Sequence, residues 1–387
     1  MKKILKYSAA CLAMFSLITL ASSCDNAAYD VMTNQAFILQ TNTNANASTK
    51  LTIAKEAVKT ELNVRLSDLA QENATFKLVP DENALKQYND VNQSPYVMLP
   101  EGTYSLSSSE VVVEAGTSIS TPVVLTVNPF TDEMTTSGKK YAVAFKLVAV
   151  DSNSSVLPAG GTIVYICDKV VIQPVPTFNY QLAIKNDEFK NKNEFALNSW
   201  TIEMNVNMSL LGEGIGVYNN QAIFANVGQN EIYIRFGDAP IDGRMLQIKL
   251  MGTQMNSKQL FKANKWYHLA FVYSAGTLNF YVNGVLDNTK EGITDKTVIM
   301  KGFTMFNTTY FKAQVNVSEL KIWEKPRSQA EIVNNMYVCD PASEGLIGYW
   351  KFNEGKGNVY KDSSKYGNDL TTEYTPVWIQ DVRIDGK

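Results

Sequence analysis

The chain has little of two residue types on which many enzymes depend. It contains one histidine, His268, and four cysteines among 387 residues. The ordinary Ser-His-Asp and Cys-His arrangements are therefore excluded unless His268 itself is the base. Cys11 and Cys24 lie near the start of the chain, whereas Cys167 and Cys339 are far apart in sequence. The last two form neither a disulfide framework nor a metal site, and we expect each to be a small buried residue, although an oxidising compartment would permit a bridge.

The chain also lacks a block of basic residues. Its 35 lysines and arginines stand against 38 aspartates and glutamates. If the first 23 residues were removed, the three lysines at positions 2, 3 and 6 would leave with them, and 32 basic residues would remain against 38 acidic ones. A mildly acidic chain of this kind is not expected to bind nucleic acid.

Residues 1–23 are typical of a signal peptide. Their lysines precede an apolar run, 12–20, that is too short for a stable membrane span. The next residues, Ala21-Ser22-Ser23-Cys24, resemble a bacterial lipobox, although Ala21 stands where leucine is usual. That resemblance implies cleavage before Cys24 and acylation of its thiol, and Asp25 resembles the acidic export signal of Bacteroidota surface lipoproteins. The expected location is the outer membrane, lipid-anchored and exposed at the cell surface; the alternative is an ordinary signal peptide followed by an incidental cysteine.

Residues 24–172 show almost no helical periodicity. Short alternating segments, the longest at 141–150, predict about seven strands separated by turns, which is typical of an immunoglobulin-like β-sandwich. Three stretches, 99–120, 140–151 and 153–166, resemble the N-terminal domain of unknown function in Bacteroidota surface lipoproteins. The resemblance implies an architecture and a location but no chemistry.

A second region with its own strand pattern occupies 177–387. Alternating prolines in the preceding segment, 173–176, favour an extended backbone and predict a linker of limited flexibility. Within the second region, 200–208 alternates apolar and polar residues and predicts a strand with one solvated face. A chain of this length is long enough for two domains.

The stretch 264–287 is the centre of the second region. The run Trp266–Tyr273 predicts a strand buried on both faces, and Asn283-Gly284 is the strongest short signal for a hairpin turn. The order W-x-H and then Y-V-N-G resembles the central hairpin of laminin G-like domains. Segment 345–370, with YWKFNEGKG and DSSKYGNDL, resembles the end of the same domains. The resemblance implies a concanavalin A-like jelly roll and, with the first domain, an all-β chain of two sandwiches.

One acidic motif bears on hydrolysis of glycans. Laminarinase-like enzymes of this fold carry two glutamates and an aspartate on one strand, and a retaining mechanism needs a close carboxylate pair. The nearest match is Glu319 and Glu324, but Lys321 stands where the aspartate should be. We therefore expect these acids to be structural, and we interpret His268 as a core histidine rather than a general base.

Three residues near the end of the chain could hold calcium. Asp362, Asn368 and Asp369 offer the oxygen ligands that Ca²⁺ prefers, and laminin G-like domains sometimes bind it. The same residue types also form turns beside glycine, which is the interpretation that we favour.

The resemblance and the missing catalytic pattern predict a non-catalytic surface protein that binds a polysaccharide or a glycoprotein glycan through its second domain. Binding residues are expected in loops or on exposed strand faces, since the hairpin is needed in the core. Two clusters fit this description: Tyr218, Asn219 and Asn220, and the segment containing Asn307 and Tyr310. The main alternative is a surface adhesion or structural protein that binds another protein; a laminarinase-like glycoside hydrolase is the second.

Overall fold

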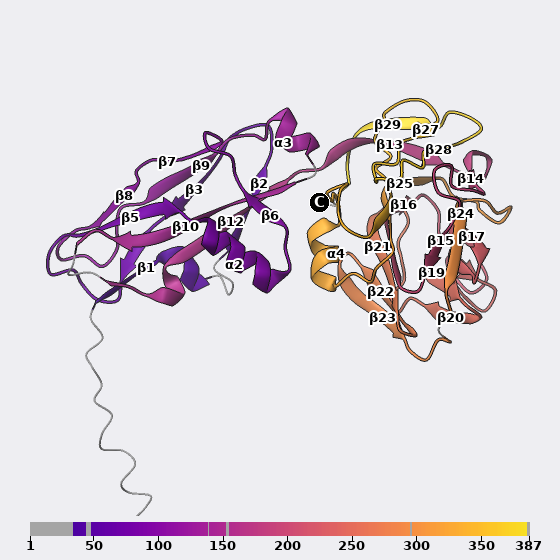
Figure 1. Ribbon diagram of the computed structural model, residues 1–387, viewed down its shortest axis with the longest axis horizontal. Coiled ribbons are helices and arrows are strands. Elements are labelled where there is room, and N and C mark those ends of the chain that lie inside the picture. Colours follow the sequence, from indigo (N-terminus) through magenta and orange to yellow (C-terminus); the bar gives the residue numbers. More distant parts are fainter. Residues whose placement is uncertain (1–33, 44–47, 138, 152–154, 295, 385–387) are drawn as a thin grey trace, which may run out of the picture.

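The computed structural model consists of two β-rich lobes that lie side by side (Figure 1). The residues described are 34–43, 48–137, 139–151, 155–294 and 296–384. The proposed signal peptide and Cys24 lie outside these ranges. No helix within them is long and apolar enough to cross a membrane. Strands dominate both lobes, so the predicted all-β fold class is confirmed.

The first lobe is a β-sandwich. Its larger sheet has the order β2-β12-β10-β5-β8, with β6 beside β10. In that order, the strands are Ser48–Ile53, Thr162–Lys169, Lys140–Ala149, Ala74–Pro80, Glu110–Val113 and Tyr96–Met98. Two smaller sheets, β11-β1-β4 and β3-β9-β7, comprise Ser155–Val156, Gln35–Ile38, Val64–Leu66, Val58–Leu62, Val123–Val127 and Tyr104–Leu106. One apolar core joins the three sheets.

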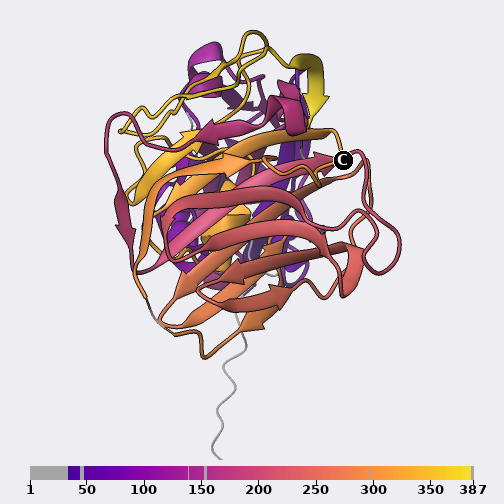
Figure 2. The same cartoon turned by 90° about the vertical axis from the view of Figure 1, so that its right-hand side faces the viewer.

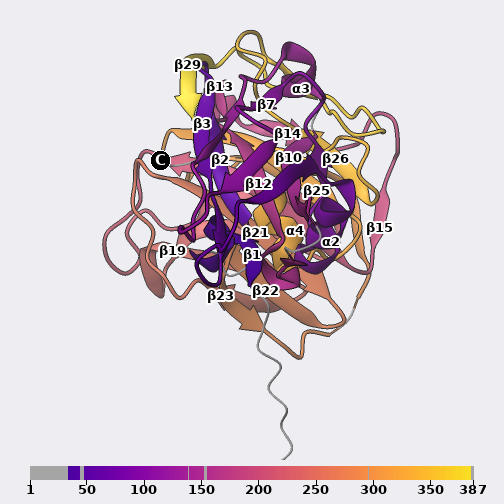
Figure 3. The ribbon, with the colours of Figure 1, turned by 90° about the vertical axis from the view of Figure 1, so that its left-hand side faces the viewer.

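The strand β10 is covered on both faces. Val143 and Phe145 lie in the core that the three sheets share. Ala142 and Ala144 point the other way, into a smaller apolar cluster with α2 (Glu82–Asn92). Figure 3 shows this lobe end-on, with α2 beside β12. The other helices among the described residues are short: η1 (Leu39–Thr43), α3 (Asp132–Thr136), η2 (Pro158–Gly160), η3 (Tyr180–Leu182) and α4 (Gln329–Asn335).

The second lobe has two large sheets around one core. The eight-stranded sheet has the order β23-β22-β21-β16-β25-β13-β29, with β26 beside β25. Its strands in that order are Val285–Lys290, Thr277–Val282, Trp266–Ser274, Trp200–Met208, Val315–Trp323, Ile172–Phe178, Val377–Arg383 and Leu346–Trp350. The seven-stranded sheet has the order β14-β24-β17-β18-β19-β20, with β15 beside β24. Its strands are Ile184–Asn186, Val298–Met305, Gln221–Gln229, Ile232–Asp238, Ile241–Leu250, Thr253–Asn256 and Phe195–Leu197. A small pair, β27 (Val359–Tyr360) and β28 (Leu370–Thr371), completes the lobe.

The two sheets face in opposite directions. The eight-stranded sheet and α4 lie toward the first lobe, whereas the seven-stranded sheet lies on the far side of the second lobe (Figure 1). Figure 2 views the molecule from that far side, with the strands of the seven-stranded sheet in front. The outer face of this sheet therefore points away from the first lobe.

The strand β16 departs from its predicted environment. Trp200 and Ile202 lie in the core between the sheets. Thr201 and Glu203 point to the opposite face, which the sequence predicted to be solvated, yet both are fully buried. That prediction is wrong because the α4 region covers this face, and Arg327, just before α4, donates to Glu203.

The predicted hairpin is confirmed. Strands β21 and β22 pair antiparallel, with Phe271 opposite Phe280 and their rings stacked 4.7 Å apart. Asn283 and Gly284 both have positive φ, 51° and 78°, as a type I′ turn requires. Trp266, at the start of β21, is only half-buried, so the predicted burial of the whole run begins one residue later.

Residues 173–176, predicted as a linker, lie inside β13 instead. This strand pairs with β29 along most of its length, from Ile172 opposite Arg383 to Thr177 opposite Val377. The register shifts between Gln173 and Val175, and a bulge of this kind accommodates a proline that cannot donate a hydrogen bond. The irregular passage between β12 and β13 is therefore only 170–171.

The two cysteines within the described residues are free and buried. Cys167 lies in the core of the first lobe, and Cys339 packs with Trp323 and Tyr349 in the second. Burial raises the pKa of both thiols to about 12, so they act as small apolar residues, as the sequence predicted.

Candidate functional site

The two predicted loop clusters lie at the same end of the seven-stranded sheet. The first, Tyr218–Asn220, directly precedes β17, which begins at Gln221. Oε1 of Gln221 accepts the N–H groups of Lys312 (3.1 Å) and Ala313 (3.0 Å), just beyond the second cluster. The Gln221 side chain thus joins the two loops.

Exposed aromatic rings mark both loops. Tyr218 is 46% exposed and Tyr310 is 55% exposed, so both rings are available to a ligand. Tyr218 and Asn220 adopt left-handed backbone conformations, with φ of 44° and 57°. Their loop approaches Gly237 so closely that a Cβ there would meet the Asn219 Cα at 3.1 Å, which explains why the chain has glycine at that position.

The Asn220 side chain connects the first loop to the sheet. Its Oδ1 accepts hydrogen bonds from the Tyr233 hydroxyl (2.8 Å) and from Nη1 of Arg235 (3.0 Å). Asn219, in contrast, donates to the carbonyl of Gly216 within its own loop. Asn220 therefore supports the outer face of β18, and Asn219 supports the loop.

A chain of polar side chains continues across the sheet from Arg235. The register places Arg235, Gln247 and Asn256 side by side on β18, β19 and β20. Nη2 of Arg235 donates to Oε1 of Gln247 (2.6 Å), and Nε2 of Gln247 donates to Oδ1 of Asn256 (2.8 Å). Arg235 also forms an ion pair with Asp238. Arg235 and Gln247 are almost fully buried, so this chain is held rigidly by its own hydrogen bonds.

A second row crosses the same face. In register, Ala225, Tyr233, Lys249 and Gln254 are neighbours on β17 to β20. Lys249 Nζ lies 6.0 Å from the centre of the Tyr233 ring, and Gln254 is exposed. We call the set Asn220, Tyr233, Arg235, Gln247, Lys249, Gln254 and Asn256 the polar face.

Sequence reasoning missed most of the polar face. Apolar residues alternate along β18, and three of them, Ile232, Ile234 and Phe236, are buried in the core. The residues between them, Tyr233 and Arg235, must then point outward, because side chains alternate along a strand. The alternation along the strand therefore predicts that Tyr233 and Arg235 point outward. It does not predict that Gln247 and Asn256 lie beside Arg235, because that depends on the strand register.

Comparison with known proteins supports the architecture of both lobes. Residues 30–154 match a family model described as an N-terminal domain. Residues 185–333 match the model of the concanavalin A-like lectin/glucanase superfamily, within the lobe whose two sheets enclose one core. The second domain is a concanavalin A-like jelly roll. No curated protein matches the chain in sequence.

Solved structures resemble the chain at low identity. A protein from Bacteroides ovatus, provisionally named as carbohydrate-binding, is 19% identical, with a TM-score of 0.57 over 90% of this chain and 99% of that one. The structure of Bacteroides thetaiotamicron EndoBT-3987 with Man5GlcNAc product is 16% identical in sequence, with a TM-score of 0.30. The match spans 35% of this chain and 31% of that one. A pentraxin from Limulus polyphemus is 10% identical in sequence, with a TM-score of 0.32, over 56% of this chain and 91% of that one. The Bacteroides ovatus structure shows that the two domains together have a known fold.

The glutamate pair of the jelly roll does not share an accessible site. Glu319 is buried, and its Oε2 accepts a hydrogen bond of 2.5 Å from the Tyr349 hydroxyl and lies 3.6 Å from Lys321 Nζ. Burial raises the pKa of Glu319, against the effect of Lys321. Glu324 is exposed. This arrangement gives Glu319 a structural role, as the sequence indicated.

His268 belongs to a buried ionic network on the α4 side of the jelly roll. Its Nε2 lies 3.2 Å from Oε2 of Glu203, whose Oε1 accepts a 2.7 Å hydrogen bond from Arg327. Burial raises the pKa of Glu203, but Arg327 and His268 outweigh this effect and lower it to about 2. Burial lowers the pKa of His268, although Glu203 opposes the shift. His268 is therefore a neutral core residue rather than an accessible base.

The proposed calcium ligands form a turn. Both oxygens of Asp362 accept protein donors: Oδ1 from the N–H groups of Tyr349 (2.9 Å) and Ser364 (2.8 Å), and Oδ2 from that of Asn368 (2.8 Å). Oδ2 of Asp369 pairs with Lys361 at 2.6 Å. In the part of the chain that the structure describes, no group of three His, Cys, Asp or Glu side chains is placed to hold a metal. The geometry favours the turn over calcium.

Proposed function

We propose that the protein is a lipid-anchored surface protein that binds carbohydrate without cleaving it, and that the polar face and its two loops form the site. The observation that supports this location is the hydrogen-bonded chain from Asn220 through Arg235 and Gln247 to Asn256. Arg235 and Gln247 are almost fully buried, so this chain supports the more exposed members of the face. The hydroxyl of Tyr233, the ammonium of Lys249 and the amide of Gln254 can form hydrogen bonds with sugar hydroxyls.

The rigidity of the polar face favours binding. Its central residues, Arg235 and Gln247, are fixed by hydrogen bonds before any ligand arrives. A preorganised site loses little side-chain entropy on binding. Tyr218 and Tyr310 add exposed rings at one end, against which the C–H face of a sugar can stack.

The orientation of the domains suits a surface receptor. The polar face points away from the first domain, and the first domain follows the proposed anchor at Cys24 (Figures 1 and 2). An anchored protein of this shape would present the site outward. Replacing Cys24 with alanine should abolish lipid labelling and release the protein from the membrane; unchanged labelling would contradict the anchor.

The non-catalytic assignment rests on the environment of Glu319. A glycosidase needs two carboxylates that reach the scissile bond together. Glu319 is sealed beneath Tyr349 and Lys321, whereas Glu324 is exposed. The provisional name of the Bacteroides ovatus protein also supports binding rather than cleavage.

A glycan array probed with the purified protein tests this proposal. We expect saturable binding to one glycan class, weakened in Tyr218→Ala and Tyr310→Ala but not in the control Tyr374→Ala, a tyrosine that is 59% exposed. Binding to no glycan would favour the protein-binding adhesin instead. Release of reducing ends from a polysaccharide panel would favour a hydrolase.

A further inference from the structure

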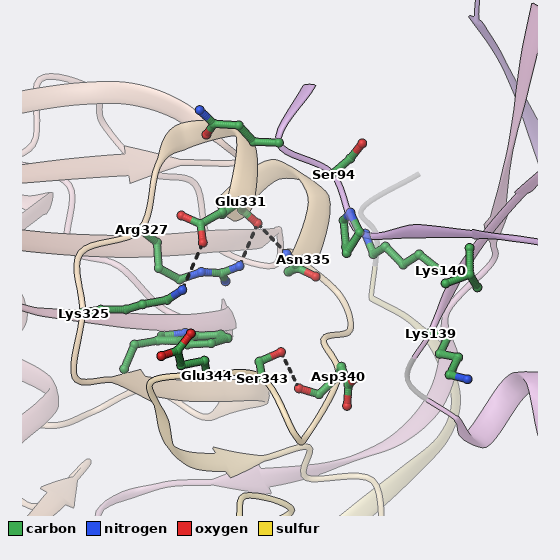
Figure 4. A pocket seen from close by; sticks show the side chains of 14 residues that line it. Ser94, Lys139, Lys140, Lys325, Arg327, Glu331, Asn335, Asp340, Ser343 and Glu344 are labelled. Atoms are coloured by element: carbon green, nitrogen blue, oxygen red, sulfur yellow. Dashed lines mark hydrogen bonds and ion pairs between the residues drawn. The ribbon is translucent and has the colours of Figure 1, made fainter. Parts of the chain in front are cut away.

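A cavity of about 410 Å³ lies between the two domains (Figure 4). Residues of α4 line it, and α4 lies on the side of the jelly roll opposite the seven-stranded sheet (Figure 1). The first domain contributes the segment that follows α2 and the start of β10; the second contributes the end of β25, α4 and the loop before β26. Near it, Nδ2 of Asn334 on α4 lies 3.4 Å from the carbonyl of Gln93, which ends α2. Ligand sites often form at such domain interfaces.

Two lysines form one wall of the cavity. Lys139 and Lys140 come from the first domain and lie on the same side of the cavity in Figure 4, where the half-buried Lys140 points toward the second domain and the exposed Lys139 points away from the cavity. Among the described residues, neither ammonium group has a carboxylate within ion-pair distance. Burial lowers the pKa of Lys140 to about 8; the negative charge of Asp168 opposes this shift, and the nearby Lys321 adds to it. An anion beside these lysines would stabilise their charged forms.

Two carboxylates line the second-domain side. Asp340 and Glu344 lie in the loop before β26, with Ser343 between them. Asp340 Oδ1 accepts the N–H of Ala342, whereas the Glu344 carboxylate makes no hydrogen bond or ion pair with another described residue. Both side chains are exposed, and an ionised carboxylate can only accept hydrogen bonds, so a ligand bound here must offer donors in place of water.

The remaining charges of the cavity are satisfied internally. Arg327 stacks 4.0 Å from the centre of the Trp323 ring and pairs with Glu203. Lys325 Nζ lies 3.4 Å from Glu331. This leaves Lys140 and the two carboxylates as the charged groups available to a ligand in the cavity.

We propose that this cavity binds a small sugar acid, with its carboxylate at Lys140 and its hydroxyl groups at Asp340, Ser343 and Glu344. A neutral sugar would leave Lys140 without an anion at ion-pair distance. A simple anion would leave the two carboxylates without donors and would be repelled by them. A polyhydroxylated acid satisfies both walls, and about 410 Å³ is within the usual size range of small-molecule sites.

Isothermal titration calorimetry of the purified protein tests the proposal. The ligands are sodium glucuronate and, as the uncharged control, glucose. We expect glucuronate to bind at pH 7 and Lys140→Met to weaken it about tenfold, as expected for the loss of one charge-assisted hydrogen bond. The control Lys59→Met, at an exposed position in the first domain, should bind like the parent. Glu344→Gln, also at an exposed position, should weaken binding less than Lys140→Met does.

The proposal is overturned if glucuronate does not bind, if glucose binds equally well, or if Lys140→Met retains full affinity while remaining folded by its melting temperature. Equal competition by sodium acetate would show an anion site without sugar recognition and would also overturn it. The site does not depend on the polar face: Tyr218→Ala should leave glucuronate binding unchanged, so the two proposals can fail separately.

Discussion

Nη1 of Arg235 donates to Oδ1 of Asn220 over 3.0 Å, and this hydrogen bond ties a surface loop to the outer face of a sheet strand. The same oxygen accepts from the Tyr233 hydroxyl. Asn220 therefore holds two side chains of the proposed site, Tyr233 and Arg235, in place through one acceptor oxygen. Arg235 is almost fully buried, so its orientation would change if this acceptor were lost.

Replacing Asn220 with alanine should lower both stability and glycan binding. The loss of one acceptor for two donors should reduce the free energy of unfolding by about 1–3 kcal/mol. Asn220→Asp keeps an acceptor oxygen and tolerates the left-handed backbone, so it should retain most of the stability. Urea denaturation of both variants measures the difference; equal loss in both would contradict the role of Oδ1.

The buried network around Glu203 should make the protein sensitive to acid. The pKa values of both His268 and Glu203 are lowered in the fold, from ordinary values of 6.5 and 4.5. The unfolded chain then binds more protons than the folded one, so stability should decrease as the pH falls below about 6.5, and further below 4.5 toward 2. Urea denaturation between pH 8 and pH 4 follows this loss.

Replacing Arg327 tests how much its ion pair with Glu203 contributes to stability. Arg327→Met leaves a charged Glu203 buried without its main partner and should cost roughly 3–5 kcal/mol at pH 7. The loss of stability at acidic pH should also be smaller in this variant, because the pKa of Glu203 is no longer strongly lowered. A variant as stable as the parent, with the same pH dependence, would show that the ion pair has no such role.

The hairpin offers a test of core packing. Phe271 is fully buried and stacks on Phe280, so Phe271→Ala should cost roughly 3–5 kcal/mol. Trp266 is half-buried, and Trp266→Ala should cost less, about 1–2 kcal/mol. Thermal unfolding compares the two; a larger loss for the tryptophan would contradict the burial described here.

The turn at Asp362 should be independent of calcium. Its carboxylate accepts four protein donors, including the Ser364 hydroxyl at 2.9 Å. Asp362→Ala should therefore reduce the free energy of unfolding by about 2–4 kcal/mol, through several unsatisfied buried donors. A chelator should leave the melting temperature of the parent unchanged. A clear rise in that temperature on adding calcium would contradict the turn interpretation.

The position of β13 gives a sharp test of the domain boundary. A shortened chain that begins at Pro176 lacks the residues that pair with the C-terminal half of β29, whereas one that begins at Val171 keeps the entire strand. The longer chain should unfold cooperatively, and the shorter one should be less stable or aggregate. Equal stability would show that the pairing of Ile172 and Gln173 with β29 contributes little.

Local sequence signals predicted much of this fold, and tertiary contacts account for the failures. The Asn283-Gly284 turn follows from backbone conformations that its two residues favour. The burial of Thr201 and Glu203 could not be predicted from alternation alone, because the covering segment lies more than a hundred residues later. The prolines at 174 and 176 resembled a linker because no local signal reveals the pairing of β13 with β29 at the end of the chain.

The candidate site, like the fold, could be predicted from the sequence only in part. Exposed loop tyrosines at 218 and 310 could be selected from the sequence, since loops rich in aromatic and amide side chains are common binding elements. The polar face could not be assembled, because Arg235, Gln247 and Asn256 come together only through the register of β18 to β20. The cavity between the domains depends on residues as distant as Lys140 and Glu344 and has no sequence signature.

The central claim is that the polar face holds the glycan, and titration of the best glycan from the array tests it most directly. Lys249→Met combined with Gln254→Ala removes two polar groups of this face without disturbing the Arg235–Gln247–Asn256 chain. We expect about tenfold weaker binding with an unchanged melting temperature, whereas the matched control Lys262→Met combined with Gln259→Ala should bind like the parent. Full affinity in the first double variant would contradict the account.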